Sequence, residues 1–218
     1  MAPVNVKENV KLAIVRQFGH PRGAVGSIAG WVMAHRGSNV ERNRWVVSLL
    51  DVQPGQRILE VGFGPGVAIA ETARRVGSTG HVYGIDRSEV MLRHASRRNA
   101  AAVRSGRITL AQASVEALPS GFEGPFDAVY AVNSMGFWTS PAERLTELGR
   151  LLAPGGRIAI ATQPRGADGT RDPVLAACER MEMLEQVGLT GIRSDTLPLD
   201  PPVVCVIGVK QTAAGSGG

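Results

Sequence analysis

The segment ILEVGFGPGVAI contains three closely spaced glycines, with one acid just before them and a second acid further along the chain. Residues of these types at this spacing could bind a ligand. Gly62, Gly64 and Gly66 permit a sharp turn and leave room for a ligand against bare peptide groups. Glu60 stands just before the first glycine, and Asp86 lies about 20 residues after the last. The Asp86 carboxylate could accept both hydroxyls of a ribose. Glu60 would disfavour a pyrophosphate and favour a ligand that carries positive charge.

The glycine spacing separates two classes of nucleotide-binding enzyme. It is GxGxG, whereas dinucleotide-binding folds carry GxGxxG. The chain also lacks a Tyr-x-x-x-Lys pair, and Tyr83 and Tyr130 both lie inside predicted strands. A nicotinamide-dependent oxidoreductase is therefore an alternative that these details disfavour.

A second group of side chains could form an apolar substrate pocket. Its aromatic and sulfur-containing members are Trp31, Met33, Met135, Phe137 and Trp138. Such a set favours a flat or apolar substrate, but the same residues could instead pack the N-terminal segment onto the sheet. Arg165, in the Gly-rich loop 163–172, could anchor an acidic group of the substrate, and that loop could act as a lid.

Histidines offer few candidates for a general base. His20 and His35 lie in the N-terminal segment and could face the pocket, although turn and surface roles are the default for both. His81 and His94 are expected to be solvated.

Short apolar runs alternate with longer amphipathic segments from residue 57 onward, and this alternation positions the glycine loop. The runs predicted as buried strands are 57–61, 81–85, 107–111, 126–132 and 157–162. The predicted helices are 67–76, 88 to about 102 with Ser88 as N-cap, 141–152 and 173–187. This order is typical of an α/β fold with a doubly wound parallel sheet.

The two ends of the chain depart from this alternation. Residues 190–199 and 201–210 are predicted to form an antiparallel pair that closes the sheet. Apolar positions at helical spacing predict helices within residues 1–50 that cap one end of the sheet. The expected organisation is thus a helical cap over 1–50, a ligand-binding domain over 51–210 and a flexible tail over 211–218.

Several motifs in order resemble those of one enzyme family. They are ILEVGFGPG, VYGIDRSEVML, ASVEALP, FDAVYAVNSMGFW and LTELGRLLAPGGRIAI, and they cover about residues 50 to 165. In them the chain resembles the class I S-adenosylmethionine-dependent methyltransferases, and within these the small-molecule, UbiE-like branch. The resemblance implies a Rossmann-like, seven-stranded sheet that is parallel except for an antiparallel C-terminal strand and is flanked by helices. It also implies transfer of a methyl group from S-adenosylmethionine by in-line displacement to a small, apolar or aromatic acceptor.

The resemblance assigns roles to individual positions. The three glycines would pass under the methionine and ribose part of the cofactor, Glu60 would lie near its amino group, and Asp86 would hold the ribose. Arg87, Ser114 and Val115 would border the adenine. Asn133 would face the methionine part and the entry to the acceptor pocket, which makes it a further candidate for a catalytic role beside His20 and His35.

Two positions depart from the family pattern. Many relatives carry Asp where this chain has Ser114, so the adenine amino group would be bound differently here. Where many UbiE-like relatives show a His-His pair, this chain has Gly136 and Phe137, so no role of those histidines can be transferred. The atom that accepts the methyl group stays open.

Composition limits the expected partners. The net charge of +5 and the arginines between Arg87 and Arg107 could suit nucleic acid, but their near-helical spacing favours a solvated helix face. An RNA or DNA methyltransferase is therefore an alternative to the expected small-molecule enzyme, and a homodimer is possible.

Cys178 and Cys205 show no metal-binding spacing, and no metal site is expected. A cytoplasmic location without a membrane span is expected, since no apolar run approaches about 20 residues.

Overall fold

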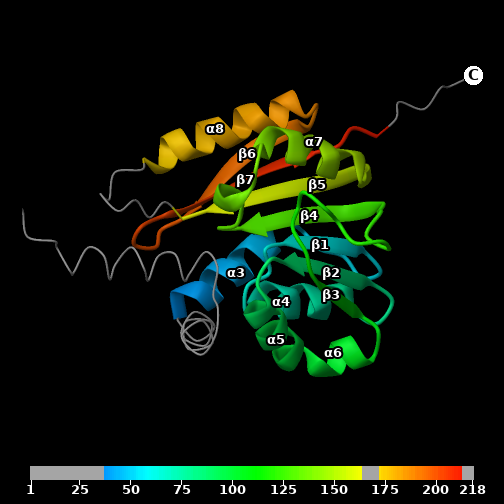
Figure 1. The fold of residues 1–218 in the computed structure, drawn as a ribbon. Coiled ribbons are helices and arrows are strands. Elements are labelled where there is room, and N and C mark those ends of the chain that lie inside the picture. Colours follow the sequence, from blue (N-terminus) through cyan, green and yellow to red (C-terminus); the bar gives the residue numbers. More distant parts are fainter. Residues whose placement is uncertain (1–36, 164–171, 213–218) are drawn as a thin grey trace, which may run out of the picture.

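A seven-stranded sheet forms the centre of the molecule in a computed structural model that describes residues 37–163 and 172–212 (Figure 1). The strands are β1 (Arg57–Val61), β2 (His81–Asp86), β3 (Ile108–Gln112), β4 (Phe126–Val132), β5 (Leu152–Thr162), β6 (Thr190–Leu197) and β7 (Val203–Val209). Their spatial order is β3-β2-β1-β4-β5-β7-β6. The first five strands run parallel, and β7 is antiparallel to both β5 and β6. The predicted fold class and the closing antiparallel pair are confirmed.

The reversal of strand order beside β1 fixes where a ligand can bind. From β1 the chain goes outward to β2 and β3, and then returns to place β4 on the other side of β1. The loops after β1 and β4 therefore separate at the carboxyl ends of these two strands, which is the position where open α/β sheets bind ligands. The glycine loop lies at this edge.

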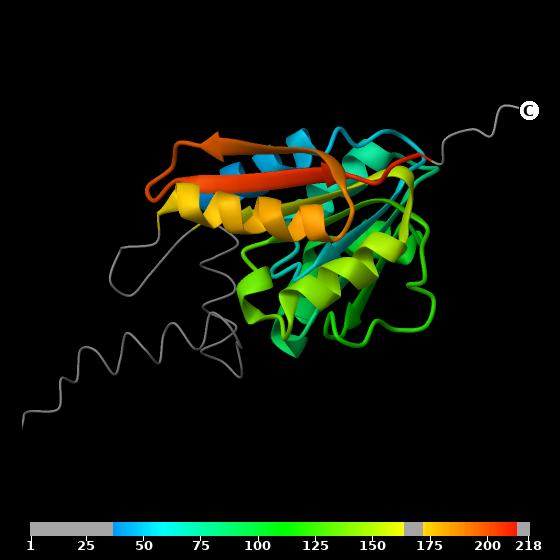
Figure 2. The same cartoon turned by 90° about the horizontal axis from the view of Figure 1, so that it is seen from above.

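Helices cover both faces of the sheet. They are α3 (Gly37–Leu49), α4 (Val67–Val76), α5 (Glu89–Arg98), α6 (Ala100–Arg104), α7 (Pro141–Arg150) and α8 (Pro173–Gln186), with a 3-10 turn η1 (Met135–Phe137) after β4. Figure 1 shows α3 to α6 on one face and α7 and α8 on the other, and Figure 2 shows α8 lying along β7. Each face has its own hydrophobic cluster: α3, α4 and α5 share one with the sheet, and α7 and α8 share the other.

Strand alternation assigns neighbouring residues of β1 to different clusters. Ile58 packs in the cluster under α3 and α4, and Leu59 packs in the cluster under α7 and α8. Glu60, the next residue, therefore faces the same side as Ile58. This acid side chain is directed into a hydrophobic layer rather than to solvent.

Two helix boundaries differ from the prediction. The single helix expected from Ser88 to about Ala102 is interrupted at Asn99, whose buried side chain donates to the carbonyl oxygens of Ala95 and Gly66. These bonds compete with the regular helical pattern and tie the helix to the glycine loop. The predicted N-cap is confirmed, since the Ser88 hydroxyl accepts from the backbone N–H of Met91.

The other boundary lies before β5. The sequence predicted a helix to Leu152 and a strand from Arg157, but α7 ends at Arg150 and Leu152 already pairs with Phe126. A register shift between Phe126 and Ala128 accommodates the Pro-Gly-Gly segment within the strand.

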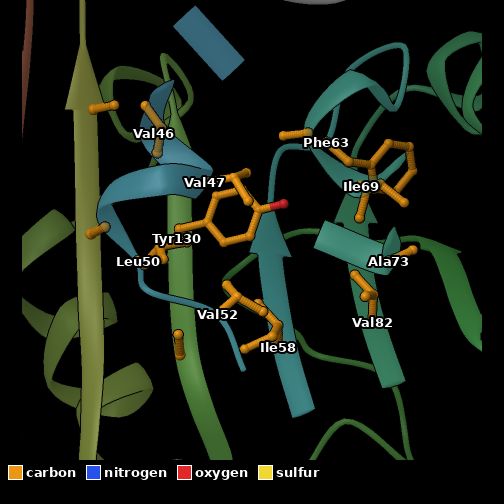
Figure 3. Close-up of a cluster of buried hydrophobic side chains, with 14 of the residues drawn as sticks. Val46, Val47, Leu50, Val52, Ile58, Phe63, Ile69, Ala73, Val82 and Tyr130 are labelled. Atoms are coloured by element: carbon orange, nitrogen blue, oxygen red, sulfur yellow. The ribbon is translucent and has the colours of Figure 1, made fainter. Parts of the chain in front are cut away.

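Only the last part of the predicted N-terminal cap lies in the described region. There α3 buries Val46 and Val47, and the chain directly after it buries Leu50, in the cluster around Tyr130 (Figure 3). The rest of the predicted cap, residues 1–36, and most of the predicted tail lie outside the described residues. No helix of the described chain has the length and apolar character that crossing a membrane requires.

Candidate functional site

The turn after β1 is held against β2 and the end of β4. The backbone N–H groups of Gly62 and Phe63 both donate to the carbonyl oxygen of Ile85, at 2.8 and 3.2 Å. Gly62 has φ 82°, and a Cβ there would lie 2.3 Å from the Cβ of Ser134. Because Ser134 follows β4, only glycine lets the β1 turn approach the β4 end so closely.

The other two glycines differ in their surroundings. Gly66 is the left-handed N-cap of α4, and a Cβ there would lie 2.8 Å from the Cβ of Ala95 on α5. Gly64 also has a positive φ, of 52°, but a Cβ there would meet no atom within 4 Å. Gly62 and Gly66 are thus required by packing within the protein, whereas Gly64 lies beside open space.

Asp86, the last residue of β2, faces the glycine loop. Its Oδ2 accepts from the backbone N–H of Gly64 at 2.8 Å, and its Oδ1 accepts from the backbone N–H of Ser88 at 2.9 Å. Two backbone amides therefore fix the orientation of a partly buried carboxylate beside the open space at Gly64. The spacing of these residues in the sequence predicted this proximity.

Glu60 is buried under the turn, with 1% of its surface exposed. Its Oε2 accepts from the Tyr130 hydroxyl at 2.9 Å, and that hydroxyl is also 2.9 Å from the Thr72 hydroxyl. Burial raises the pKa of the Glu60 carboxyl from 4.5 to about 8, the Tyr130 hydrogen bond opposes this rise, and the negative charge of Asp86 adds to it. In the free protein at neutral pH, this carboxyl is therefore largely protonated.

The residues predicted to border an adenine lie along the next loops. Arg87 is exposed, its Nη1 donates to the Phe137 carbonyl oxygen at 3.3 Å, and its own carbonyl accepts from Gln112. Ser114 is partly buried, whereas the Val115 side chain packs in the cluster under α7 and α8. Arg87 follows β2 and Ser114 and Val115 follow β3, so all three lie on the same side of β1 as Asp86.

Asn133 directly follows β4 and has a left-handed conformation with φ 57°. Its Oδ1 accepts from the backbone N–H of Gln163, at the end of β5, at 2.6 Å. The Gln163 side chain accepts from the Arg42 guanidinium at 2.7 Å and donates to the Pro201 carbonyl oxygen at 2.7 Å. One connected set of bonds thus joins the ends of β4 and β5 to α3 and to the β6–β7 connection.

Arg42, Tyr130 and Thr72 were not predicted as site residues, and Gln163 was predicted only as the first residue of the lid loop 163–172. No sequence motif links Arg42 with Gln163, because the two residues that form this hydrogen bond are 121 positions apart in the chain. Gln163 did carry one signal, since a polar residue directly after a buried parallel strand lies at the ligand-binding edge. Tyr130 was recognised only as a strand residue, although a phenol in a buried strand needs a hydrogen-bond partner.

The predicted substrate-pocket residues separate into three groups. Met135 is buried and Trp138 partly buried in the cluster under α7 and α8, on the face of the sheet opposite α3, so their packing there is not against the described part of the N-terminal segment. Phe137 is 54% exposed at the same edge as Arg87. Trp31, Met33, Arg165, His20 and His35 lie outside the described residues.

The arrangement fits a cationic nucleoside. A cofactor with ribose, ammonium and sulfonium groups needs bare backbone, an acceptor for hydroxyls and nearby acidic groups. The open space at Gly64, the oriented carboxylate of Asp86 and the acid Glu60 supply these three features at one turn. Within the described residues, no group of three metal-ligating side chains is brought together.

Comparisons with known proteins agree with this geometry. A family model described as a methyltransferase domain matches residues 58–156. The uncharacterized methyltransferase YdaC of Bacillus subtilis (strain 168) is 39% identical over 145 residues, which cover 66% of this chain and 75% of YdaC. The ubiquinone/menaquinone biosynthesis C-methyltransferase UbiE of Geotalea daltonii is 32% identical over 117 residues, 54% of this chain and 49% of that protein. The chain thus matches about half the length of this UbiE.

A solved structure supports the fold. The SAM-dependent methyltransferase of Aquifex aeolicus superposes with a TM-score of 0.60 at 19% identity, over 79% of this chain and 97% of that chain. The matches to the methyltransferase family model and to YdaC confirm the resemblance found in the sequence motifs, and the oxidoreductase alternative is set aside. The chain belongs to the class I S-adenosylmethionine-dependent methyltransferases.

Proposed function

We propose that S-adenosylmethionine binds in the crevice beside Gly64, with its ribose hydroxyls on Asp86 and its methionine part over the glycine turn. The observation that carries this proposal is the orientation of the Asp86 carboxylate by the Gly64 and Ser88 amides. A carboxylate held in place in advance loses little freedom when it accepts the diol. Glu60 then lies on the methionine side of the turn, where the positive charges of the cofactor come closest to it.

Arg87, Ser114 and Val115 complete the adenine side in this proposal. The bond from Arg87 to the Phe137 carbonyl joins the loop after β2 to the turn after β4, so the two loops border the adenosine together. Ser114 supplies its backbone and hydroxyl, and Val115 anchors the loop through its buried side chain.

The proposed chemical role of the chain is to align the acceptor with the methyl group of the cofactor. The cofactor supplies the methyl group, and in-line displacement requires that acceptor, methyl and leaving sulfur be collinear in a site without water. Asn133 lies where cofactor and acceptor meet, and its bond to Gln163 keeps the amide in one orientation. A dedicated base is needed only where the acceptor must lose a proton.

The acceptor proposed here is a small apolar or aromatic molecule. Two observations support it: an aromatic side chain, Phe137, is exposed at the edge of the site, and one relative is named for ubiquinone and menaquinone biosynthesis. Trp31, Met33 and Arg165 remain predicted members of this pocket. Production of S-adenosylhomocysteine from a panel of phenols, quinols and aliphatic acids tests the class. Activity that depends on added RNA and falls steeply with salt would contradict it.

The cofactor site is tested by Asp86→Ala with Asp127→Ala as its matched control. Both carboxylates accept a backbone N–H at the end of a strand, but Asp127 accepts from Arg57 at the opposite edge of the sheet. Loss of charge-assisted bonds to two hydroxyls should weaken S-adenosylhomocysteine binding by about 100-fold in Asp86→Ala. Calorimetric titration should find the affinity of Asp127→Ala within about threefold of wild type. Equal affinities in the two variants would show that the ribose lies elsewhere.

A further inference from the structure

The carboxyl of Glu60 belongs to a buried polar group that the methyl-transfer chemistry does not use. Its members, Glu60 on β1, Tyr130 on β4 and Thr72 on α4, are each at most 1% exposed. Tyr130 donates to Glu60, and the Thr72 and Tyr130 hydroxyls share a hydrogen bond. Figure 3 shows the Tyr130 ring among Val46, Val47 and Leu50, so an apolar layer surrounds this group on the side of α3.

The charged and titratable groups around Glu60 disfavour its ionised form. From β2, the carboxylate of Asp86 repels a second negative charge. From β4, Tyr130 remains a neutral phenol, because burial and then the charge of Glu60 raise its pKa well above the usual value. From α4, the backbone N–H of Ile69 donates to Glu60, and together with the Tyr130 hydroxyl it lowers the pKa. These two donors offset only part of the cost of burial, and the pKa remains near 8.

We propose that Glu60 is a neutral acid in the free enzyme and gives up its proton to solvent when the cationic cofactor binds, while Tyr130 holds the carboxyl in place through both states. This inference rests on the proposed cofactor site. The O–H bond of Glu60 breaks, the proton passes to the buffer, and the carboxylate remains to balance the positive charge of the ligand. Tyr130 is a positioning residue here, since its hydroxyl donates to whichever form is present.

The inference predicts a number of protons that can be counted. A nearby opposite charge lowers a carboxyl pKa by about 1–3, and a shift of about 2 moves Glu60 from about 8 to about 6. Binding at pH 7 then releases about 0.8 proton, and release falls toward zero at pH 5 and at pH 9.5. Over pH 6 to 8 the affinity of wild type should rise about 25-fold relative to a variant without this acid.

Calorimetric titration of the full chain with S-adenosylmethionine, in buffers of different ionisation enthalpy at pH 7, measures the release directly. Glu60→Gln is the reference, because it keeps the shape of the side chain and cannot ionise, while any proton lost from the ligand itself is common to both proteins. We expect wild type to release about 0.8 proton more than Glu60→Gln. Equal release with cofactor bound would overturn the inference and leave the proposed site intact. Failure of wild type to bind would instead contradict the proposed function.

Tyr130→Phe and Thr72→Val test the positioning role. Both remove a buried hydroxyl, but only Tyr130→Phe removes a donor to Glu60. The midpoint of the affinity rise should move up by about one pH unit in Tyr130→Phe, and by less than about 0.3 in Thr72→Val. Thermal unfolding checks that each variant is folded at the temperature of the titration. If the affinity rise had the same midpoint pH in the two folded variants, Tyr130 would have no positioning role and would contribute only to packing.

Discussion

The two halves of the carboxyl edge of the sheet are built from different interactions. At the β1–β2 half, backbone amides of the glycine turn bond to the Ile85 carbonyl and to the acid Asp86, and a second acid, Glu60, accepts from Tyr130 beneath the turn. At the β4–β5 half, long side chains form the contacts, and two buried arginines take part: Arg42 bonds to Gln163, and Arg180 bonds to Thr162. The acidic half suits a cationic cofactor, which is common to the family. The bonds of Arg42 with Gln163 and of Arg180 with Thr162 include no residue of the glycine turn.

The largest effect that we expect at the β1–β2 half comes from adding a methyl group to the glycine turn. In Gly62→Ala the new Cβ meets Ser134 at 2.3 Å on a backbone with φ 82°, and we expect a loss on the order of 4 kcal/mol in the free energy of unfolding. Gly64→Ala, at φ 52° and beside open space, should lose only about 1 kcal/mol. Urea denaturation measures both.

Cofactor binding should show a different pattern in the same two variants. Gly64→Ala places its Cβ in the crevice, so S-adenosylhomocysteine affinity should fall although the fold is kept. The double variant Gly62→Ala/Ser134→Gly removes one partner of the clash and should recover part of the stability. Equal stability losses in Gly62→Ala and Gly64→Ala would mean that the turn does not approach the β4 end as closely as the structure shows.

The buried acid of the β1 half should give stability a distinct pH dependence. The folded pKa of Glu60, about 8, lies above its ordinary value of 4.5, so between these values the unfolded chain binds fewer protons than the folded one. The contribution of Glu60 to stability is therefore present in full below about pH 4.5 and is lost as pH rises to about 8. Glu60→Gln lacks this loss. As pH rises from 5 to 8, its free energy of unfolding should therefore increase by on the order of 3 kcal/mol relative to that of wild type.

Glu71→Gln provides the contrasting variant. Glu71 is a buried acid on the neighbouring helix α4, but it is ion-paired with Arg74 and Arg75. The side chains of Arg74 and Arg75 are 66% and 33% exposed and remain solvated in the variant, so the loss of their attraction to Glu71 should lower the free energy of unfolding at pH 7 by less than about 1 kcal/mol. Denaturation curves at several pH values distinguish the two cases. A parallel response of Glu60→Gln and wild type across the range would show that Glu60 is ionised in the folded protein throughout.

The same contrast explains what the sequence could predict. The glycine turn, Asp86 and the order of strands follow from local patterns: short β-rich runs, glycine spacing and an acid at a strand end. The break at Asn99 could not be predicted in this way, because it depends on a bond to Gly66, which lies 33 residues earlier in the chain. The protonation of Glu60 depends on burial by α3, α4 and β4, which only the packed structure reveals. Contacts that the backbone encodes locally were found, and contacts between distant side chains were missed.

The smallest expected effect comes from the β4–β5 half. Gln163→Leu removes the carboxamide that accepts from Arg42 and donates to Pro201, while the backbone N–H that binds Asn133 remains. Because Arg42 is only 8% exposed and its guanidinium loses a charge-assisted bond, the free energy of unfolding should fall by about 2 kcal/mol. S-adenosylhomocysteine affinity should stay within about threefold of wild type, since the β1–β2 half is unchanged.

Gln163→Glu is the matched control for that variant. It keeps an acceptor for Arg42 and loses only the donor to Pro201, so it should retain most of the stability that Gln163→Leu loses. Denaturation and calorimetry on the same preparations separate stability from cofactor binding. If Gln163→Leu weakened cofactor binding as strongly as Asp86→Ala, the two halves of the edge would be one coupled unit. The acceptor side could then not vary independently of the cofactor turn.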